Sequence, residues 1–250
     1  MKTIRFNLHQ DFANYRRFYD FQQSQSYPLP PLSTVTGMLH TLANLKGYHP
    51  MKLFVTGSAA GTTQDYRTQY EFANTVTTLN SKSKQKDTWA RYQFMKNQTA
   101  FATGPKPVQM LVDVNLTIYV QPQSQEDFNA ILDGLQNPIV YPALGRHEDS
   151  ADITNIQVID LQTVKLDHEY KSNQYLSTYM PIEYARKHHI KLESGTKYNI
   201  HHHFGYEKVN KDVTRRSWTD VNMMYTSQYH VNPGSEIIMD SQNNQLVALI

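Results

Sequence analysis

The sequence predicts an α+β fold in which two strand–helix–strand units are separated by a long insertion. Apolar residues alternate strictly over 110–120 and more briefly over 4–8, which is typical of half-buried strands. Two further segments, 33–47 and 124–136, carry apolar residues at helical spacing. The chain has 250 residues, of which 39% are hydrophobic and 18% charged. This length suits one large domain, or one domain with an appendage.

The first unit begins with the strand at 4–8. A Pro-rich run, 27–31, then leads to a helix that we expect Ser33 to cap, because a hydroxyl can accept from the unpaired N–H groups of a helix start. Gly47 is expected to end this helix, since glycine readily adopts the left-handed conformation of a helix C-terminus. A short strand is predicted at 53–55.

The second unit begins with the strand at 110–120, the clearest periodic segment of the chain. Ser124, with Asp127 three residues later, resembles a capping box and predicts the start of a second helix. Asn137 and Pro138 are expected to end it. A further strand is predicted within 153–166.

This order of elements predicts a ferredoxin-like (RRM-like) βαββαβ domain over residues 1–166, with an insertion at about 62–106. Many RNA-binding domains have this arrangement, although the same order also hosts unrelated functions. Residues 167–250 are predicted to form a small, mostly β C-terminal subdomain with strands near 237–239 and 246–250.

Composition and motifs exclude several kinds of site. The chain has no cysteine, which rules out disulfides, thiolate zinc sites and cysteine nucleophiles. P-loop, nucleophile-elbow and dinucleotide-binding motifs are missing. Histidines gather at 188–189 and 201–203, but adjacent histidines on a strand should point to opposite faces, so neither a metal nor a cofactor is predicted. Without a secretory signal or a run of about 20 apolar residues, we expect a cytoplasmic protein with no membrane span.

The insertion is the first candidate for binding nucleic acid. The whole chain carries 24 Lys and Arg against 22 acids, so such a site must come from local clustering. The insertion has seven basic residues and three acidic ones, a net charge of +4, interleaved with aromatic rings on which bases could stack. The alternative is a solvated hairpin with a small aromatic core. The residues proposed to contact RNA are Arg67, Lys82, Lys84, Lys86, Trp89 and Arg91.

The second candidate is the approach to the first helix. A helix start offers unpaired N–H donors and a positive dipole end to a phosphate, and a glycine lets another backbone come close. An ordinary capped helix start is the alternative. The candidate residues are Arg16, Arg17, Tyr27, Ser33, Thr34 and Gly37.

The third candidate is the turn at 141–149, where Gly145, Arg146 and His147 could present backbone and guanidinium donors to phosphates. The alternative is that an Arg–Glu pair holds this turn shut.

These segments resemble the Cas-five family of CRISPR-associated proteins, within the repeat-associated superfamily, and most closely its type I-B version. The similarity lies in 11–17, in 27–39 with its Tyr-Pro-x-Pro-Pro-x-Ser/Thr-x-x-x-Gly pattern, in 91–95 and in 141–148. The resemblance implies a subunit with a protruding thumb that grips the 5′ handle of CRISPR RNA in the antiviral Cascade complex. It also implies docking on the large subunit and a backbone subunit, and contact with target DNA only through the complex.

The resemblance leaves catalysis open. One branch of the family, in type I-C systems, cuts precursor RNA with a Tyr-Lys-His set, whereas Lys106 and the strand after it lack a neighbouring His. This difference favours a non-catalytic role. A metal-independent endoribonuclease remains the alternative, because Tyr, His and Lys can supply general acids and bases without a fixed motif. A third possibility is a pure protein-interaction module whose thumb lysines face acidic partners.

Overall fold

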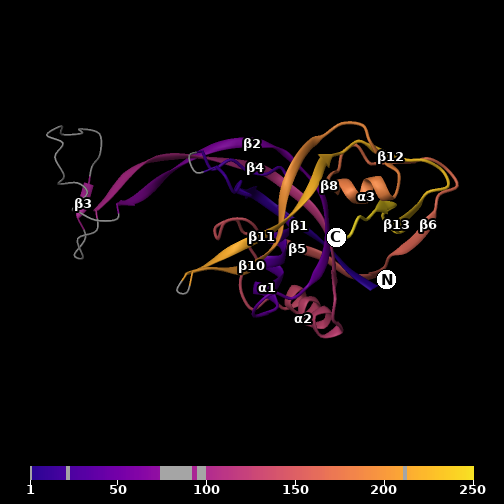
Figure 1. Ribbon diagram of the computed structural model, residues 1–250, viewed down its shortest axis with the longest axis horizontal. Coiled ribbons are helices and arrows are strands. Elements are labelled where there is room, and N and C mark those ends of the chain that lie inside the picture. Colours follow the sequence, from indigo (N-terminus) through magenta and orange to yellow (C-terminus); the bar gives the residue numbers. More distant parts are fainter. Residues whose placement is uncertain (1, 21–22, 74–91, 95–99, 211–212) are drawn as a thin grey trace.

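A computed structural model describes residues 2–20, 23–73, 92–94, 100–210 and 213–250. Within these residues, the fold is built on one large antiparallel sheet with hydrogen-bonded strand order β10-β11-β8-β2-β4-β1-β5, to which β3 adds by pairing with β4 (Figure 1). Its strands are β1 (Lys2–Ala13), β2 (Met51–Ala73), β3 (Tyr92–Phe94), β4 (Ala100–Pro122), β5 (Asp152–Asp160), β8 (Ser177–Pro181), β10 (Thr196–Asn210) and β11 (Val213–Thr226).

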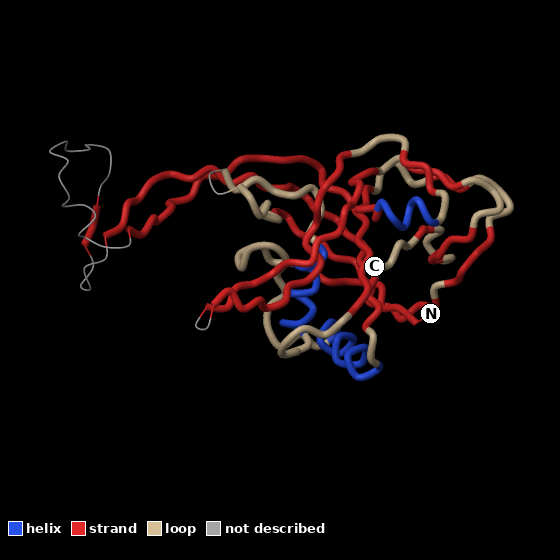
Figure 2. Tube along the Cα trace, in the orientation of Figure 1, coloured by secondary structure: helices blue, strands red, loops and turns tan. Residues whose placement is uncertain are grey.

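Two helices cover one face of this sheet, and the C-terminal segments cover the other (Figure 2). Strand alternation explains the two cores: Leu53 and Val55 on β2 pack with the helices, while Phe54 between them packs with the C-terminal segments. The helices are α1 (Leu32–Leu42), α2 (Gln125–Gln136) and, on the opposite side, α3 (Ile182–Lys187). Two smaller sheets comprise β6 (Gln162–Lys165), β7 (Tyr170–Lys171), β9 (Ile190–Leu192), β12 (Tyr229–Val231), β13 (Glu236–Asp240) and β14 (Gln245–Leu246).

The second helix confirms its predicted start, whereas the first does not. In α2 the Ser124 side chain accepts a hydrogen bond from the Asp127 backbone N–H at 3.0 Å. In α1 the N-cap is Pro31, and Ser33 lies within the first turn, so the expected Ser33 cap is wrong. Proline is favourable here because its fixed φ suits a helix entry, and its carbonyl accepts from the Thr34 N–H at 2.9 Å. The helix also ends at Leu42, well before Gly47.

Most of the predicted insertion consists of strands. β2 and β4 each span 23 residues and pair in one register from Met51 with Pro122 to Ala73 with Ala100. They therefore form a long hairpin that leaves the body of the molecule (Figure 1). From 61 to 68 every β2 residue is exposed, so no alternation of apolar and polar residues marks this part of the strand.

The C-terminal region contributes to the main sheet. β10 and β11 form a second hairpin, and β11 pairs with β8, which pairs in turn with β2. The predicted boundary between 166 and 167 thus cuts through one continuous sheet. A buried ion pair also ties the two ends of the chain, because Arg5 on β1 donates to Asp240 on β13 at 2.6 Å. The predicted strands near 237–239 and 246–250 correspond to β13 and to β14, which is only two residues long.

Candidate nucleic-acid interface

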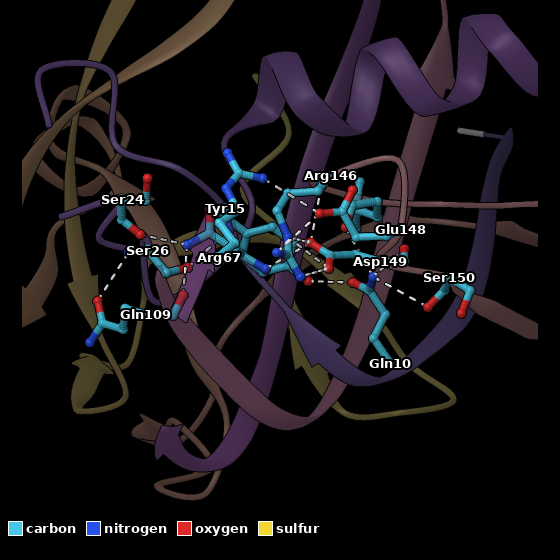
Figure 3. Close-up of polar contacts among 12 residues, drawn as sticks. Gln10, Tyr15, Ser24, Ser26, Arg67, Gln109, Arg146, Glu148, Asp149 and Ser150 are labelled. Carbon is cyan, nitrogen blue, oxygen red and sulfur yellow. Dashed lines mark hydrogen bonds and ion pairs between the residues drawn. The ribbon is translucent and has the colours of Figure 1, made fainter. Parts of the chain in front are cut away.

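A network of hydrogen bonds fixes the loop after β1 against the turn at 141–150 (Figure 3). The Gln10 side chain donates to the Leu144 and Asp149 carbonyls, both at 2.9 Å, and accepts from the Tyr15 hydroxyl at 2.7 Å. The Asn14 side chain donates to the Ser24 carbonyl at 2.8 Å. Because the polar groups of Gln10, Asn14 and Tyr15 are buried and paired, both segments are held in one conformation.

Asp149 organises the turn itself. Its buried carboxylate accepts from the Asn14 backbone N–H at 2.9 Å, from the Arg146 backbone N–H at 3.0 Å and from Arg146 Nη2 at 2.6 Å. Arg146 Nη1 lies 3.1 Å from Glu148. The hydrogen bond to Asp149 raises the pKa of the Arg146 guanidinium above its usual value. Arg146 is therefore engaged within the turn, chiefly by Asp149 and also by Glu148, the partner that the alternative interpretation named. Its proposed contact with RNA stays a prediction.

Gly145 is required by the backbone at this point. Its φ of +104° lies in the region that favours glycine, and a Cβ at this position would lie 2.8 Å from the Asn14 carbonyl oxygen. The turn can therefore pack directly on the loop after β1, and the exposed His147 stands beside it.

Two of the sequence candidates meet in one groove, which we call the turn groove. The start of α1 and the turn at 141–149 face each other across a cavity of about 690 Å³. Among the described residues that line it, none is acidic. The lining residues are Ser33, Thr34, Gly37, Met38, Thr41, Leu42, Val140, Tyr141, Ala143, Gly145 and His147. Five predicted residues therefore share one site, although they come from two segments more than 100 positions apart in sequence.

A neighbouring groove at the base of the long hairpin has the opposite character, and we call it the thumb-base groove. Its volume is about 730 Å³, and it lies between the end of β1, residues 63–65 of β2 and the turn. Its ionisable lining residues are mostly acidic: Asp11, Asp65, Glu148, Asp149 and Asp152, with His9 and Arg146. Phosphates would be repelled here. Arg67 lies near this groove, with its Nη1 atom 3.7 Å from Glu148 Oε1.

The remaining candidates from the loop after β1 are divided between surface and core. Arg16 is exposed and donates to the Asp20 carbonyl. Arg17 is half-buried, and its guanidinium lies 6.0 Å from the Tyr27 ring centre and 5.8 Å from that of Tyr198. Tyr27 is only 4% exposed, so it packs in the core and offers no face on which a base could stack. Its burial raises the pKa of its hydroxyl.

The thumb residues Lys82, Lys84, Lys86, Trp89 and Arg91 lie outside the described residues. Their proposed RNA contacts stay predictions.

Sequence reasoning missed a third groove, between α1 and the β10–β11 hairpin. It is lined by Ser33, Thr36, Gly37, His40, Gly47, Tyr48, His202, His203, Phe204, Gly205 and Tyr206, and we call it the hairpin groove. The runs of His and aromatic residues at 201–206 were the local sequence pattern that pointed to this groove. Its position could not be predicted, because the groove depends on the pairing of β11 with β8, which are far apart in sequence.

Two further observations concern the described part of the chain alone. No group of three or more His, Asp or Glu side chains in it is placed to hold a metal ion. None of its helices is long and apolar enough to cross a membrane.

Comparison with known protein families identifies one that matches most of this chain. The family described as "CRISPR-associated protein (Cas_Cas5)" matches residues 3–220. A chain of a structure described as a "CRISPR RNA-guided surveillance complex" is similar over 91% of both chains, with 15% identity and a TM-score of 0.52. At that identity the similarity shows the fold alone.

Two more solved structures are similar at lower TM-scores. A CRISPR protein from Archaeoglobus fulgidus is 9% identical over 99% of this chain and 98% of its own, with a TM-score of 0.46. A chain of the type III-B Cmr-beta complex bound to cognate target RNA and AMPPnP is 10% identical over 92% of this chain and 86% of its own, with a TM-score of 0.45. A search of the curated proteins gives no match.

Proposed function

Because the chain belongs to the Cas5 family of CRISPR-associated proteins, we propose that it binds CRISPR RNA as a non-catalytic subunit of an RNA-guided surveillance complex. The observation that carries this proposal is the turn groove, where the start of α1 meets Gly145 and His147. Hydroxyl, backbone and imidazole groups converge there without an acidic residue among the described lining, which suits a polyanion.

The finer assignment follows the resemblance described above. We propose that the RNA segment is the 5′ handle, that the complex is a type I-B Cascade, and that its large subunit and a backbone subunit dock on this chain. The strand order β2-β4-β1-β5, with α1 and α2 on one face, supports a ferredoxin-like core. Target DNA would be contacted only through the assembled complex.

Charge favours a particular path for the RNA. The thumb-base groove carries five carboxylates, whereas the described lining of the turn groove carries none. A phosphate chain would therefore follow α1 through the turn groove and avoid the base of the long hairpin.

The proposal can be tested by adding a negative charge to the turn groove. His147 is exposed and lines this groove, so His147→Glu should leave the fold intact and repel a nearby phosphate. We expect handle-bearing RNA to bind about fivefold more weakly, which corresponds to about 1 kcal/mol for one partly screened charge pair. Fluorescence anisotropy with the full chain and its partner subunits would measure this.

A matched control is Gln162→Glu on β6, which adds the same charge at an exposed position outside the three grooves. It should bind RNA as the unaltered chain does. The proposed function fails if handle-bearing RNA binds no better than a scrambled sequence in the presence of the partner subunits. It also fails if both variants lose the same affinity.

A second candidate function is a metal-independent endoribonuclease, which one observation favours. In the hairpin groove the Tyr48 ring stacks on His203 at 4.5 Å between centres, and His40 lies beside Tyr48 at 6.5 Å. A phenol and two imidazoles in one groove could act as general acid and base. Incubating the purified protein with repeat RNA in chelator decides between the two: a defined cut supports the enzyme, and intact RNA supports the binding subunit.

A further inference from the structure

The hairpin groove is as large as the turn groove and adjacent to it. Its volume is about 690 Å³, within the range of small-molecule sites. Ser33 and Gly37 line both grooves, so α1 forms a common floor. The turn at 141–149 forms a wall of the turn groove, and β10 forms a wall of the hairpin groove. An RNA strand that occupied the turn groove would have the hairpin groove as its neighbour.

Aromatic rings form the walls of the hairpin groove. His40, Tyr48 and His203 lie nearly parallel, with interplanar angles of 9° between His40 and Tyr48 and 15° between Tyr48 and His203. On β10, Phe204 and Tyr206 meet edge to face at 5.6 Å, and Tyr206 is 71% exposed. The Tyr206 ring is therefore accessible to a molecule in the groove.

A β-bulge sets the orientation of the histidines. The pairing of β10 with β11 shifts between His201 and His203, which leaves His202 as the extra residue. The sequence predicted that adjacent histidines here would point to opposite faces, but His202 and His203 approach each other, with their Nδ1 atoms 2.8 Å apart. The prediction was wrong for this pair because the bulge interrupts strand alternation.

Hydrogen bonding then leaves one imidazole nitrogen available. His202 Nε2 lies 3.4 Å from the Ile250 carbonyl, which can only accept, so Nε2 carries the proton. In neutral His202, Nδ1 must therefore accept from the Nδ1–H of His203. Among the described contacts His203 Nε2 has no partner, so a polar atom remains for a molecule in the groove.

The groove is open above its three glycines, and a cation lies beside one of its lining rings. A Cβ added to Gly37, Gly47 or Gly205 would meet no atom within 4 Å. The Arg216 guanidinium lies 4.6 Å from the centre of the Phe204 ring. Among the described lining residues none is acidic. Flat π faces, one hydrogen-bonding nitrogen and a nearby cation together match an unpaired base with its phosphate.

We infer that the hairpin groove binds one unpaired nucleobase of single-stranded RNA, stacked on the aromatic side chains of β10. This inference rests on the proposed function and adds a second contact region to it. A base is favoured over a peptide because the exposed Tyr206 ring offers a flat stacking face, although β10 is also an edge strand of the main sheet.

The test removes the exposed ring. Tyr206→Ala should weaken binding of handle-bearing RNA about tenfold, which is typical for the loss of one stacked base. Tyr206→Trp should restore affinity because it keeps a stacking face. The dependence of binding on salt should be unchanged in both, because no phosphate contact is removed. The measurement is fluorescence anisotropy at several salt concentrations, with the full chain and its copurifying subunits.

Two more variants make the result specific. Gly205→Leu should fill the open space and weaken binding as well, since Gly205 lines the hairpin groove and not the turn groove. Tyr175→Ala is the matched control, because Tyr175 is 88% exposed and lines none of the three grooves. It should bind RNA normally.

The outcomes separate this inference from the proposed function. If RNA bound the unaltered chain with preference for the handle, and Tyr206→Ala and Gly205→Leu bound equally well, only the base site would be overturned. Loss of a copurifying subunit with unchanged RNA affinity would also overturn it, in favour of a protein contact. Equally weaker binding of handle and scrambled RNA by Tyr206→Ala would support a base site that does not read sequence, whereas equal binding of the two RNAs by the unaltered chain would refute handle recognition. A chain that bound no RNA would refute both.

Discussion

Replacing Asp149 should lower the free energy of unfolding more than replacing any other residue of the turn. Its carboxylate is buried and accepts from two backbone N–H groups and from the Arg146 side chain, whose Nη2 lies 2.6 Å away. Removing one partner of a buried, hydrogen-bonded ion pair typically costs about 3–5 kcal/mol. The Arg146 side chain is 20% exposed and keeps Glu148, so the free energy of unfolding of Asp149→Ala should fall by about 3 kcal/mol, the lower end of this range.

Replacing Arg146, the other partner of this ion pair, should lower the free energy of unfolding less. In Arg146→Ala the carboxylate keeps its hydrogen bonds from the Asn14 and Arg146 backbone N–H groups, so we expect a loss of about 1–2 kcal/mol. Urea unfolding followed by circular dichroism measures both values. Glu148→Gln is the control, because its side chain is 54% exposed and an exposed ion pair contributes at most about 1 kcal/mol.

Asp149→Ala also tests whether the turn shapes the proposed RNA site. Because Asp149 holds the turn that carries Gly145 and His147, Asp149→Ala should also weaken RNA binding under conditions where the protein stays folded. Equal losses of stability in Asp149→Ala and Glu148→Gln would refute this account. So would a loss below 1 kcal/mol in Asp149→Ala, where we expect about 3 kcal/mol.

Two further predictions concern the backbone and pH. Gly145→Ala should lower the free energy of unfolding by about 1–3 kcal/mol, because alanine must adopt φ of +104° with its Cβ 2.8 Å from the Asn14 carbonyl oxygen. Gly37→Ala has open space around the new Cβ, so it should be neutral or stabilise the protein by up to about 1 kcal/mol. Urea unfolding measures both changes. Burial lowers the pKa values of His40 and His202, so the unfolded chain binds more protons below the usual histidine pKa, and the free energy of unfolding should fall as pH drops from 7 to 5. His202→Gln should show a smaller fall over the same pH range, and an identical fall would contradict the assignment.

The inner parts of the sheet and both of its large helices could be predicted from sequence because they are half-buried. In β4, alternate residues from Val114 to Val120 lie in the core beneath the helices, and the residues between them are exposed or half-buried except Tyr119, which lies in the other core. The α2 cap at Ser124 is a local interaction between neighbours in sequence. The outer part of β2, at 61–68, has water on both faces, so its side chains record no periodicity. The start of α1 was misplaced because Pro31 and Ser33 are both suitable helix-start residues, and local preference did not decide between them.

The candidate site was predictable only in part, because it depends on contacts between distant segments. The motifs at the start of α1 and at 141–149 were recognised singly, and the network around Gln10 and Asp149 brings them together. Tyr27 shows the opposite case: its ring suits a base equally well by chemistry, but the fold places it in the core. The hairpin groove was missed because it depends on the bulge at His202 and on pairing of β11 with β8.

The distribution of charge explains how a chain of net charge +2 could bind RNA. Averaged over the molecule, 24 basic residues are almost balanced by 22 acidic ones, and no general attraction for a polyanion results. The acids are not spread evenly, however. Five line the thumb-base groove, and the described linings of the turn and hairpin grooves contain none. Since screening limits electrostatic forces to about 8–10 Å at physiological salt, an RNA strand responds to the groove it occupies rather than to the total charge. The acidic groove would therefore act as a barrier that directs the strand along α1 towards β10.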